Sequence, residues 1–251
     1  MSVPFVSSPL LSSVEGVVHG FTNRHGGVSA PPHDTLNLGL RNGDDRASVQ
    51  TNRRAVAAAL GKADSKLITL RQIHGDDIVE VGHIAGSGIE ADGLWTRDPK
   101  AVIAVLVADC VPILFAHAEG RAVGAVHAGW RGTKAKIGAH MVRRFEKAGF
   151  TAADLRVAIG PAIGPCCFEV GGDVFEELFA VFPDIAGAFH PSMDGGHVDL
   201  WTLNQQMLQD AGISRDHIEV IDRCTLCSDG FFSHRRDKGD TGRQAGVIAL
   251  G

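Results

Sequence analysis

The stretch Ala104–Gly132, AVLVADCVPILFAHAEGRAVGAVHAGWRG, decides the fold, because two apolar runs in and around it each end near a reactive side chain. The runs, residues 101–107 and 122–126, are short, rich in β-branched residues and bounded by Gly, Pro or Asp. These features are typical of strands buried on both faces. Cys110 ends the first run and His127 ends the second, so we expect a thiol and an imidazole at the carboxyl ends of neighbouring strands.

A third candidate ligand lies upstream, at His74 in the segment Arg71-Gln-Ile-His-Gly. Cys110 and His127 alone could form a nucleophile and its base. One thiolate with two imidazoles instead suits zinc or copper, and three protein ligands leave a fourth position for water or substrate. His74 therefore favours a metal site over a nucleophile pair, although spacing alone fits both.

Asp109, directly before Cys110, is the candidate for proton transfer. A carboxylate at a strand end can orient a ligand histidine or act as a general base. It can equally cap the backbone at Val111 and Pro112. The sequence fits the catalytic and the capping interpretation equally well.

Four arginines are candidates for binding an anion such as phosphate. Arg24 stands beside Gly26-Gly27, Arg53 on a predicted helix, Arg131 in a glycine-rich turn between a strand and a helix, and Arg243 near the end of the chain. Guanidinium groups recognise phosphate and carboxylate in a bidentate manner, and the free amides of a helix start can add to such a site. For each arginine the alternative is a solvated surface charge.

Composition limits the class of protein. The 251 residues are expected to form one domain over residues 1–251, and the net charge of −5 gives no general attraction to nucleic acid or anionic membranes. No apolar run approaches the roughly 18 residues of a membrane span, and Met1 to Ser13 lacks the pattern of a secretory signal. We expect a cytoplasmic protein with no nucleic-acid or membrane partner; the sequence specifies no oligomeric state.

The rest of the chain alternates between strand and helix signals. Before the central stretch we expect strands at 14–21, 67–70 and 78–81, a helix from Asp44 or Asp45 to Leu60, and a turn-rich connection at 86–93 that contains Asp92. After it we expect helices at 133–148, 173–181 and 200–211, and strands at 155–159, 218–221, 231–234 and 245–250.

Four further cysteines accompany Cys110, and we expect thiols rather than a disulfide framework. Cys224-Thr-Leu-Cys227 has the spacing of redox and zinc motifs, but no second pair has matching spacing. The adjacent Cys166-Cys167 is too tight to replace one. We therefore expect a local or incidental role for Cys224 and Cys227.

Several motifs together resemble a known family. They are GFTNRHGGVS at 20–29, LNLG at 36–39, QIHG at 72–75, ADCVP at 108–112, VHAGWRG at 126–132, IGPAIGPCC at 159–167 and FFSHRR at 231–236. In this order they resemble the bacterial polyphenol-oxidase-like, or laccase-domain, family of zinc-dependent purine nucleoside phosphorylases. The resemblance implies an α+β domain with two stacked sheets between helical layers, a four-layer α/β/β/α sandwich similar to the toxin deamidase fold.

The resemblance also implies zinc at His74, Cys110 and His127. It implies phosphorolysis of adenosine, inosine, guanosine and methylthioadenosine, together with adenosine deamination, so that purine nucleosides and phosphate are the expected partners. The chain departs from the family pattern at Phe168 and His234, where the family tends to carry tyrosine.

Four other functions stay open. A cysteine hydrolase or deamidase would use Cys110 as nucleophile and His127 as base. A copper-dependent polyphenol oxidase fits poorly, because the chain contains no His-x-His pair. A structural zinc protein or partner-binding module would hold the same metal without turnover. The family resemblance also implies a fourth function, the editing of cell-wall precursors.

Overall fold

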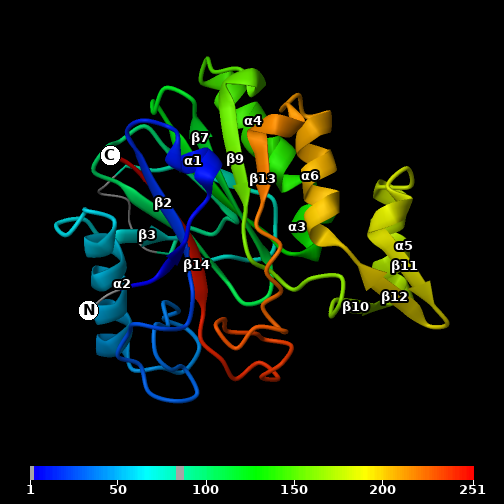
Figure 1. Ribbon diagram of the computed structural model, residues 1–251, viewed down its shortest axis with the longest axis horizontal. Coiled ribbons are helices and arrows are strands. Elements are labelled where there is room, and N and C mark those ends of the chain that lie inside the picture. The colour runs from blue at the N-terminus through cyan, green and yellow to red at the C-terminus, as the bar shows by residue number, and fades with distance from the viewer. Residues whose placement is uncertain (1–2, 83–87) are drawn as a thin grey trace.

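Two β-sheets lie face to face at the centre of the molecule, with helices outside them (Figure 1). The computed structural model describes residues 3–82 and 88–251. The predicted connection at 86–93 and the segment Met1 to Ser13 therefore lie partly outside the described residues.

The larger sheets have five and six strands. The order in the first sheet is β1 (Phe5–Val6), β2 (Val17–Thr22), β14 (Gln244–Leu250), β6 (Val102–Val107) and β3 (Leu67–Thr69). The order in the second sheet is β13 (Ile218–Val220), β9 (Leu155–Ile159), β7 (Val111–His117), β8 (Val123–Ala128), β5 (Gly93–Thr96) and β4 (Ile78–Glu80). Within the second sheet, β7 pairs antiparallel with β8 and β9, whereas β13 runs parallel to β9.

The helices and the remaining strands complete the chain. The helices are α1 (Pro9–Ser12), α2 (Arg46–Ala59), α3 (Trp130–Lys134), α4 (Ile137–Lys147), α5 (Gly172–Val181) and α6 (Leu200–Asp210), with short 3₁₀ turns at Ala152–Asp154, Ala186–Ala188 and Arg215–His217. A small third sheet of β10 (Glu169–Gly171), β12 (Gly195–Val198) and β11 (Phe189–Ser192) lies with α5 at one end of the molecule, at the right of Figure 1.

One apolar cluster fills the space between the two large sheets. It contains Phe21 and Ile103 from the first sheet and Leu94 and Leu114 from the second. Alternate side chains of β7 point to opposite faces of its sheet, so Leu114 faces this cluster while Phe115 faces away from it. A strand that is buried on both faces has apolar residues at successive positions, which explains why the central stretch contains uninterrupted apolar runs.

Two further clusters join the sheets to the helices. On the outer side of the first sheet, Val247 packs with Val56 of α2. On the outer side of the second sheet, Phe115 packs with Phe145 of α4 and Leu203 of α6. The layers therefore run helix, sheet, sheet, helix, and the α/β/β/α sandwich of an α+β protein is confirmed.

Local signals in the sequence predicted several elements well. Helix α2 begins after Asp45, whose carboxylate accepts a hydrogen bond from the Ser48 N–H at 2.8 Å, and Gly61 follows the helix with a φ of +75°. The strand predicted at 155–159 is β9. The helix predicted at 133–148 is interrupted instead, because Lys136 adopts a left-handed φ of 59° between α3 and α4.

The strand predicted at 231–234 is wrong. The Phe232 N–H donates to the side-chain oxygen of Gln244 at 2.7 Å, and the Phe232 carbonyl accepts from the side-chain amide of Gln244 at 3.0 Å. A glutamine side chain thus satisfies the backbone groups that a neighbouring strand would otherwise pair. The segment is a loop.

The two apolar runs of the central stretch are not neighbouring strands of one sheet, as had been expected. β6 belongs to the first sheet and β8 to the second. Residues 108–110 carry the chain from β6 across to β7, and β7 then pairs with β8 so that Val111 lies opposite Ala128. The corner between the sheets, rather than strand pairing, brings Cys110 beside His127.

The cluster between the sheets allows a stability prediction. Replacing the fully buried Leu114 with alanine is expected to lower the free energy of unfolding by about 2–5 kcal/mol, because the change removes apolar contacts and leaves a cavity. Urea denaturation measures the loss. The control is Met193→Ala, at a fully exposed position, where a change within about 0.5 kcal/mol is expected. Equal stability of the two variants would contradict this account of the core.

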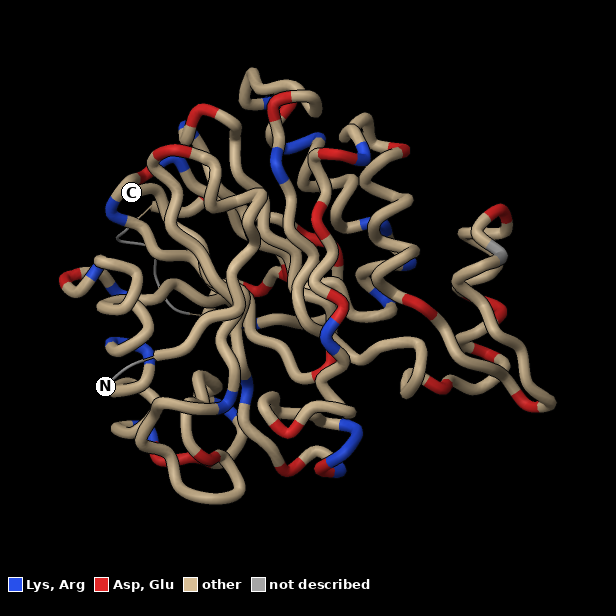
Figure 2. Tube along the Cα trace, in the orientation of Figure 1, with Lys and Arg blue, Asp and Glu red and all other residues tan. Residues whose placement is uncertain are grey.

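Charged residues of both signs are interspersed along the trace (Figure 2), in keeping with the net charge of −5. Among the described residues, no helix combines the length and the apolarity that a bilayer span requires.

Candidate functional site

His74, Cys110 and His127 lie together. Their ligand atoms are all within 4.8 Å of one another, and the two imidazole rings meet edge to face with centroids 4.8 Å apart. His74 is exposed on the loop after β3, Cys110 lies at the corner between β6 and β7, and His127 is buried in β8. Residues up to 53 positions apart therefore meet at one point, as the sequence had suggested.

Asp92 holds two of these residues in place. Its carboxylate accepts a hydrogen bond from His127 Nδ1 at 2.8 Å and from the backbone N–H groups of Ile73, His74 and Gly75 at 2.7–3.1 Å. His74 has a left-handed φ of 60°, and the three amide contacts hold the turn in that conformation. Since Asp92 occupies Nδ1 of His127, Nε2 is the nitrogen that faces Cys110 or a metal ion.

Asp92 is the functional residue that the sequence analysis missed, since it was assigned only to a turn-rich connection. The signal available in the sequence was its position between Ala91 and the strand at Gly93. A carboxylate that enters a buried strand needs polar partners, because charged side chains are almost never fully buried unless they are paired. Asp92 is fully buried, and its partners are the site residues themselves.

The thiol and the imidazole stabilise each other's charged forms. Burial opposes ionisation of Cys110, but the charge and hydrogen bonding of His127 and His74 lower its pKa to about 6. Burial likewise opposes protonation of His127, but the Cys110 thiolate and the hydrogen bond to Asp92 raise its pKa to about 9. Each of the two groups therefore favours the charged form of the other, and a metal cation would take the place of the imidazolium proton.

The three side chains fit a transition-metal ion. One thiolate and two imidazoles form a donor set that suits zinc or copper. Gly129 keeps the space beside them open, because a Cβ there would lie 3.0 Å from Cys110 Sγ and 3.1 Å from His74 Nδ1. The site can therefore hold a metal ion, and three ligands leave one coordination position for another molecule.

The three residues lie in the wall of a cavity of about 500 Å³. This volume lies within the range of small-ligand sites. Of the four candidate arginines, Arg53 and Arg243 are among the described residues that line the cavity, whereas Arg24 and Arg131 are not. Phe168 and His234, where the chain departs from the family pattern, also line it.

Of the five arginines that line the cavity, the two candidates from the sequence are anchored by backbone carbonyls. Arg53 donates from Nε and Nη2 to the Leu38 carbonyl, and Arg243 donates from Nη1 to the carbonyls of Thr241 and Gly242. Burial, with the nearby Arg46, lowers the pKa of Arg53 to about 10, so the group still carries its charge at neutral pH. Both guanidiniums can offer their remaining donors to an anion.

The other two arginines have partners of their own. Arg24 donates to the Asp34 carboxylate at 3.1 Å and lies over the ring of Phe232. The Arg131 guanidinium stacks 4.3 Å from the ring centre of Trp130. The phosphate-binding role of all four arginines stays a prediction, with a cavity position for two of them.

Asp109 lies at the cavity wall beside Cys110 and is nearly buried. Its carboxylate accepts hydrogen bonds from the Thr225 hydroxyl at 2.6 Å and from the Arg235 N–H at 2.8 Å. These bonds tie the corner after β6 to the segment after β13 and to the loop at 231–236. Asp109 is thus held at the cavity wall by partners from two other segments, and its role in proton transfer stays a prediction.

All five cysteines are free. The expectation that Cys166-Cys167 is too tight to stand in for a second pair is wrong, because both cysteines lie against Cys224 and Cys227. The reason is topological: parallel β9 and β13 end at the same edge of the second sheet, so the segments that follow them run side by side.

Comparison with known proteins adds a family and a set of relatives. The family described as "Multi-copper polyphenol oxidoreductase laccase" matches residues 18–251. The chain is 40% identical over 246 residues to "Purine nucleoside phosphorylase YlmD" of Geobacillus stearothermophilus, covering 93% of this chain and 90% of the relative. It is 40% identical over 237 residues to "Purine nucleoside phosphorylase YfiH" of Escherichia coli, covering 94% and 95%.

Solved structures share the fold. The crystal structure of YlmD from Geobacillus stearothermophilus matches with a TM-score of 0.90 at 37% identity, covering 100% of this chain and 96% of that one. The crystal structure of a Bacillus licheniformis hypothetical protein YfiH matches with a TM-score of 0.87 at 35% identity, covering 99% of both chains.

Proposed function

Because the chain belongs to the multi-copper polyphenol oxidoreductase laccase family, we propose that it is a purine nucleoside phosphorylase that depends on a metal ion held by His74, Cys110 and His127. The observation that carries the proposal is the set of three ligands in the wall of a cavity that is also lined by arginines, Arg53 and Arg243 among them. The proposed reaction is taken from the names of the relatives, and the proposed phosphate site from the arginines in the cavity wall.

Zinc is the metal we propose. Zinc accepts a mixed thiolate and imidazole set and, at catalytic sites, keeps one position open. Copper in an electron-transfer site of two histidines and one cysteine usually has a distant axial methionine. No methionine occurs among the described residues that line the cavity, and the chain has no His-x-His pair for a copper cluster.

In the proposed phosphorolysis, phosphate attacks the sugar carbon, the bond from that carbon to the purine breaks, and the purine takes up a proton. Arg53 and Arg243 would hold the phosphate oxygens and orient one of them towards the sugar. Asp109 would carry the proton, because it lies beside the ligands in the cavity wall. Bound zinc would supply Lewis-acid activation of the purine, or of a water for attack at C6.

The proposed substrates are adenosine, inosine, guanosine and methylthioadenosine, with deamination of adenosine as a second activity. A cavity of about 500 Å³ is large enough for a nucleoside. The net charge of −5 supports small anionic or neutral ligands rather than nucleic acid. Free thiols support a reducing, cytoplasmic location, and the three adjoining apolar clusters support a single domain.

A cysteine hydrolase is the second candidate, and one observation favours it. Cys110 lies beside His127, whose Nδ1 is held by Asp92 at 2.8 Å, and His127 lowers the pKa of the thiol; a nucleophile, its base and an orienting carboxylate have this arrangement. A thiolate bound to zinc is not free for alkylation, whereas a nucleophilic thiolate is. Rapid labelling of Cys110 by iodoacetamide in protein without stoichiometric metal would therefore favour the hydrolase.

The test is a nucleoside assay on purified protein whose zinc content has been measured. With inosine and phosphate we expect hypoxanthine and ribose 1-phosphate, and with adenosine we expect inosine and ammonia as well. Omission of phosphate is the control, and it should abolish release of the base while sparing deamination. Zinc-loaded protein that releases no base in the presence of phosphate would overturn the phosphorylase proposal.

A further inference from the structure

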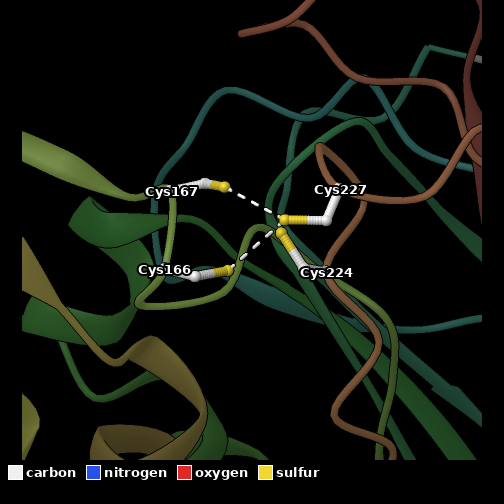
Figure 3. Close-up of side chains that lie close together, drawn as sticks. All are labelled: Cys166, Cys167, Cys224 and Cys227. Carbon is white, nitrogen blue, oxygen red and sulfur yellow. Dashed lines mark hydrogen bonds between the residues drawn. The ribbon is translucent and has the colours of Figure 1, made fainter.

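Four cysteines meet at a point outside the cavity. Figure 3 shows the side chains of Cys166, Cys167, Cys224 and Cys227 converging from two segments, and their sulfur atoms all lie within 4.8 Å of one another. Cys227 Sγ is 3.6 Å from Cys166 Sγ and 3.3 Å from Cys167 Sγ. None of these residues is among those that line the cavity or that form the first metal site.

We propose that these four cysteines form a second metal site, in which four thiolates enclose one zinc ion. Zinc bound by four sulfurs at about 2.3 Å has sulfur to sulfur distances of about 3.8 Å in a regular tetrahedron. The distances of 3.3 and 3.6 Å and the limit of 4.8 Å fall around this value. The ligands need only small side-chain shifts to reach tetrahedral geometry.

A shared cation explains the arrangement better than a disulfide does. A disulfide joins two sulfurs and would leave the other two cysteines without a role. Here Cys227 touches both Cys166 and Cys167, so no single pairing accounts for the contacts. Four thiolates this close together would repel one another, and a bound divalent cation would remove that repulsion.

A backbone N–H group also stabilises one of the four sulfurs as a thiolate. The Gly164 N–H donates a hydrogen bond to Cys224 Sγ, with the two atoms 3.3 Å apart. A Cβ at Gly164 would lie 3.3 Å from Cys224 Cβ and 2.9 Å from the Trp201 ring, so this amide can approach the sulfur closely only from a glycine. A hydrogen bond of this kind orients a metal ligand and stabilises its charge.

The site would join two segments that support the cavity wall. Thr225 N–H donates to the Ala162 carbonyl at 2.9 Å, and Ala162 forms a parallel bridge with Cys224. The first segment also carries Ile163 and Phe168, which line the cavity, and Thr225 of the second holds Asp109. Because all four positions would be filled by protein, the expected role of this zinc is structural.

Metal counting tests the proposal and does not depend on the activity of the protein. Wild-type protein, grown with added zinc and freed of any affinity tag, is expected to hold two zinc ions per chain by mass spectrometry of the metal. The double variant Cys224→Ser/Cys227→Ser is expected to hold one. Cys110→Ser, a matched change outside the cluster, is also expected to hold one, because it removes the first site.

Cobalt distinguishes the two proposed sites by the number of thiolates that bind it, and Cys110→Ser leaves all four cysteines of the cluster in place. Cobalt-loaded Cys110→Ser protein is expected to keep the intense sulfur-to-cobalt charge-transfer absorption of four thiolates, whereas the double variant should keep only that of one. The proposal is overturned if Cys110→Ser lacks the four-thiolate absorption, or if wild-type protein and the double variant hold equal amounts of zinc. A disulfide between the two segments in non-reducing peptide mapping of freshly purified protein would overturn it as well.

Discussion

Replacing His74 with alanine is expected to lower kcat/KM for inosine phosphorolysis by about 10³-fold, because Lewis-acid activation supplies several kcal/mol and each 1.36 kcal/mol corresponds to a factor of ten. His74 is one of three ligands, and its exposed ring contributes no apolar core contact. The fold should therefore survive the change while the metal is lost. Steady-state rates and zinc content, measured on the same preparation, report both effects.

His190→Ala is the matched control for this variant. His190 is an exposed histidine on β11, away from the described residues of the cavity, and its loss should leave both the rate and the zinc content unchanged. Equal rates for His74→Ala and wild type would remove the metal mechanism. If that outcome came with rapid alkylation of Cys110, the cysteine hydrolase would become the better account.

Elements with a complete local signal could be predicted from the sequence. The helix after Asp45 has its cap, its apolar face and its glycine within one segment, and the strand at 155–159 is a single apolar run. The layer order needed the family resemblance, because the choice of sheet for each apolar run depends on distant partners. No residue pattern in or beside 101–107 and 122–126 indicates that these two runs belong to different sheets, as β6 and β8 do.

Long-range polar contacts explain what the sequence did not predict. The segment 231–234 has the composition of a strand, yet the side chain of Gln244, 12 residues after Phe232, takes its backbone groups. Cys166 and Cys227 are 61 residues apart and meet through the parallel pairing of β9 and β13. A spacing rule that searches for a second Cys-x-x-Cys cannot find such a pair.

Among the site residues, His74, Cys110 and His127 could be proposed as a set because their types suit one metal ion. Asp92 could not, because its role is to accept hydrogen bonds from residues 17 to 35 positions away. Residue type predicts what a side chain can bind, whereas only the fold shows which neighbours orient it. The roles assigned to Arg53, Arg243 and Asp109 rest on position in the cavity and stay predictions.

Asp92→Asn is expected to weaken zinc binding about 10–100-fold, the usual cost of losing the partner that orients a metal ligand. The carboxylate accepts four hydrogen bonds, from three backbone amides and from His127 Nδ1. Asparagine keeps the volume but has one acceptor oxygen, and its NH₂ group would face donors that it cannot satisfy. The turn at His74 and the ring of His127 should both lose their fixed orientation. Competition with a chromophoric zinc chelator measures the affinity.

The matched control is Asp76→Asn, because Asp76 lies on the same loop but pairs at the surface with His140 at 3.0 Å. Its zinc affinity should stay within about twofold of wild type, since exposed ion pairs contribute little. A purely structural role for Asp92 would lower the melting temperature of the metal-free protein and leave zinc affinity unchanged. That result would contradict the view that the buried carboxylate of Asp92 positions both histidines for metal binding.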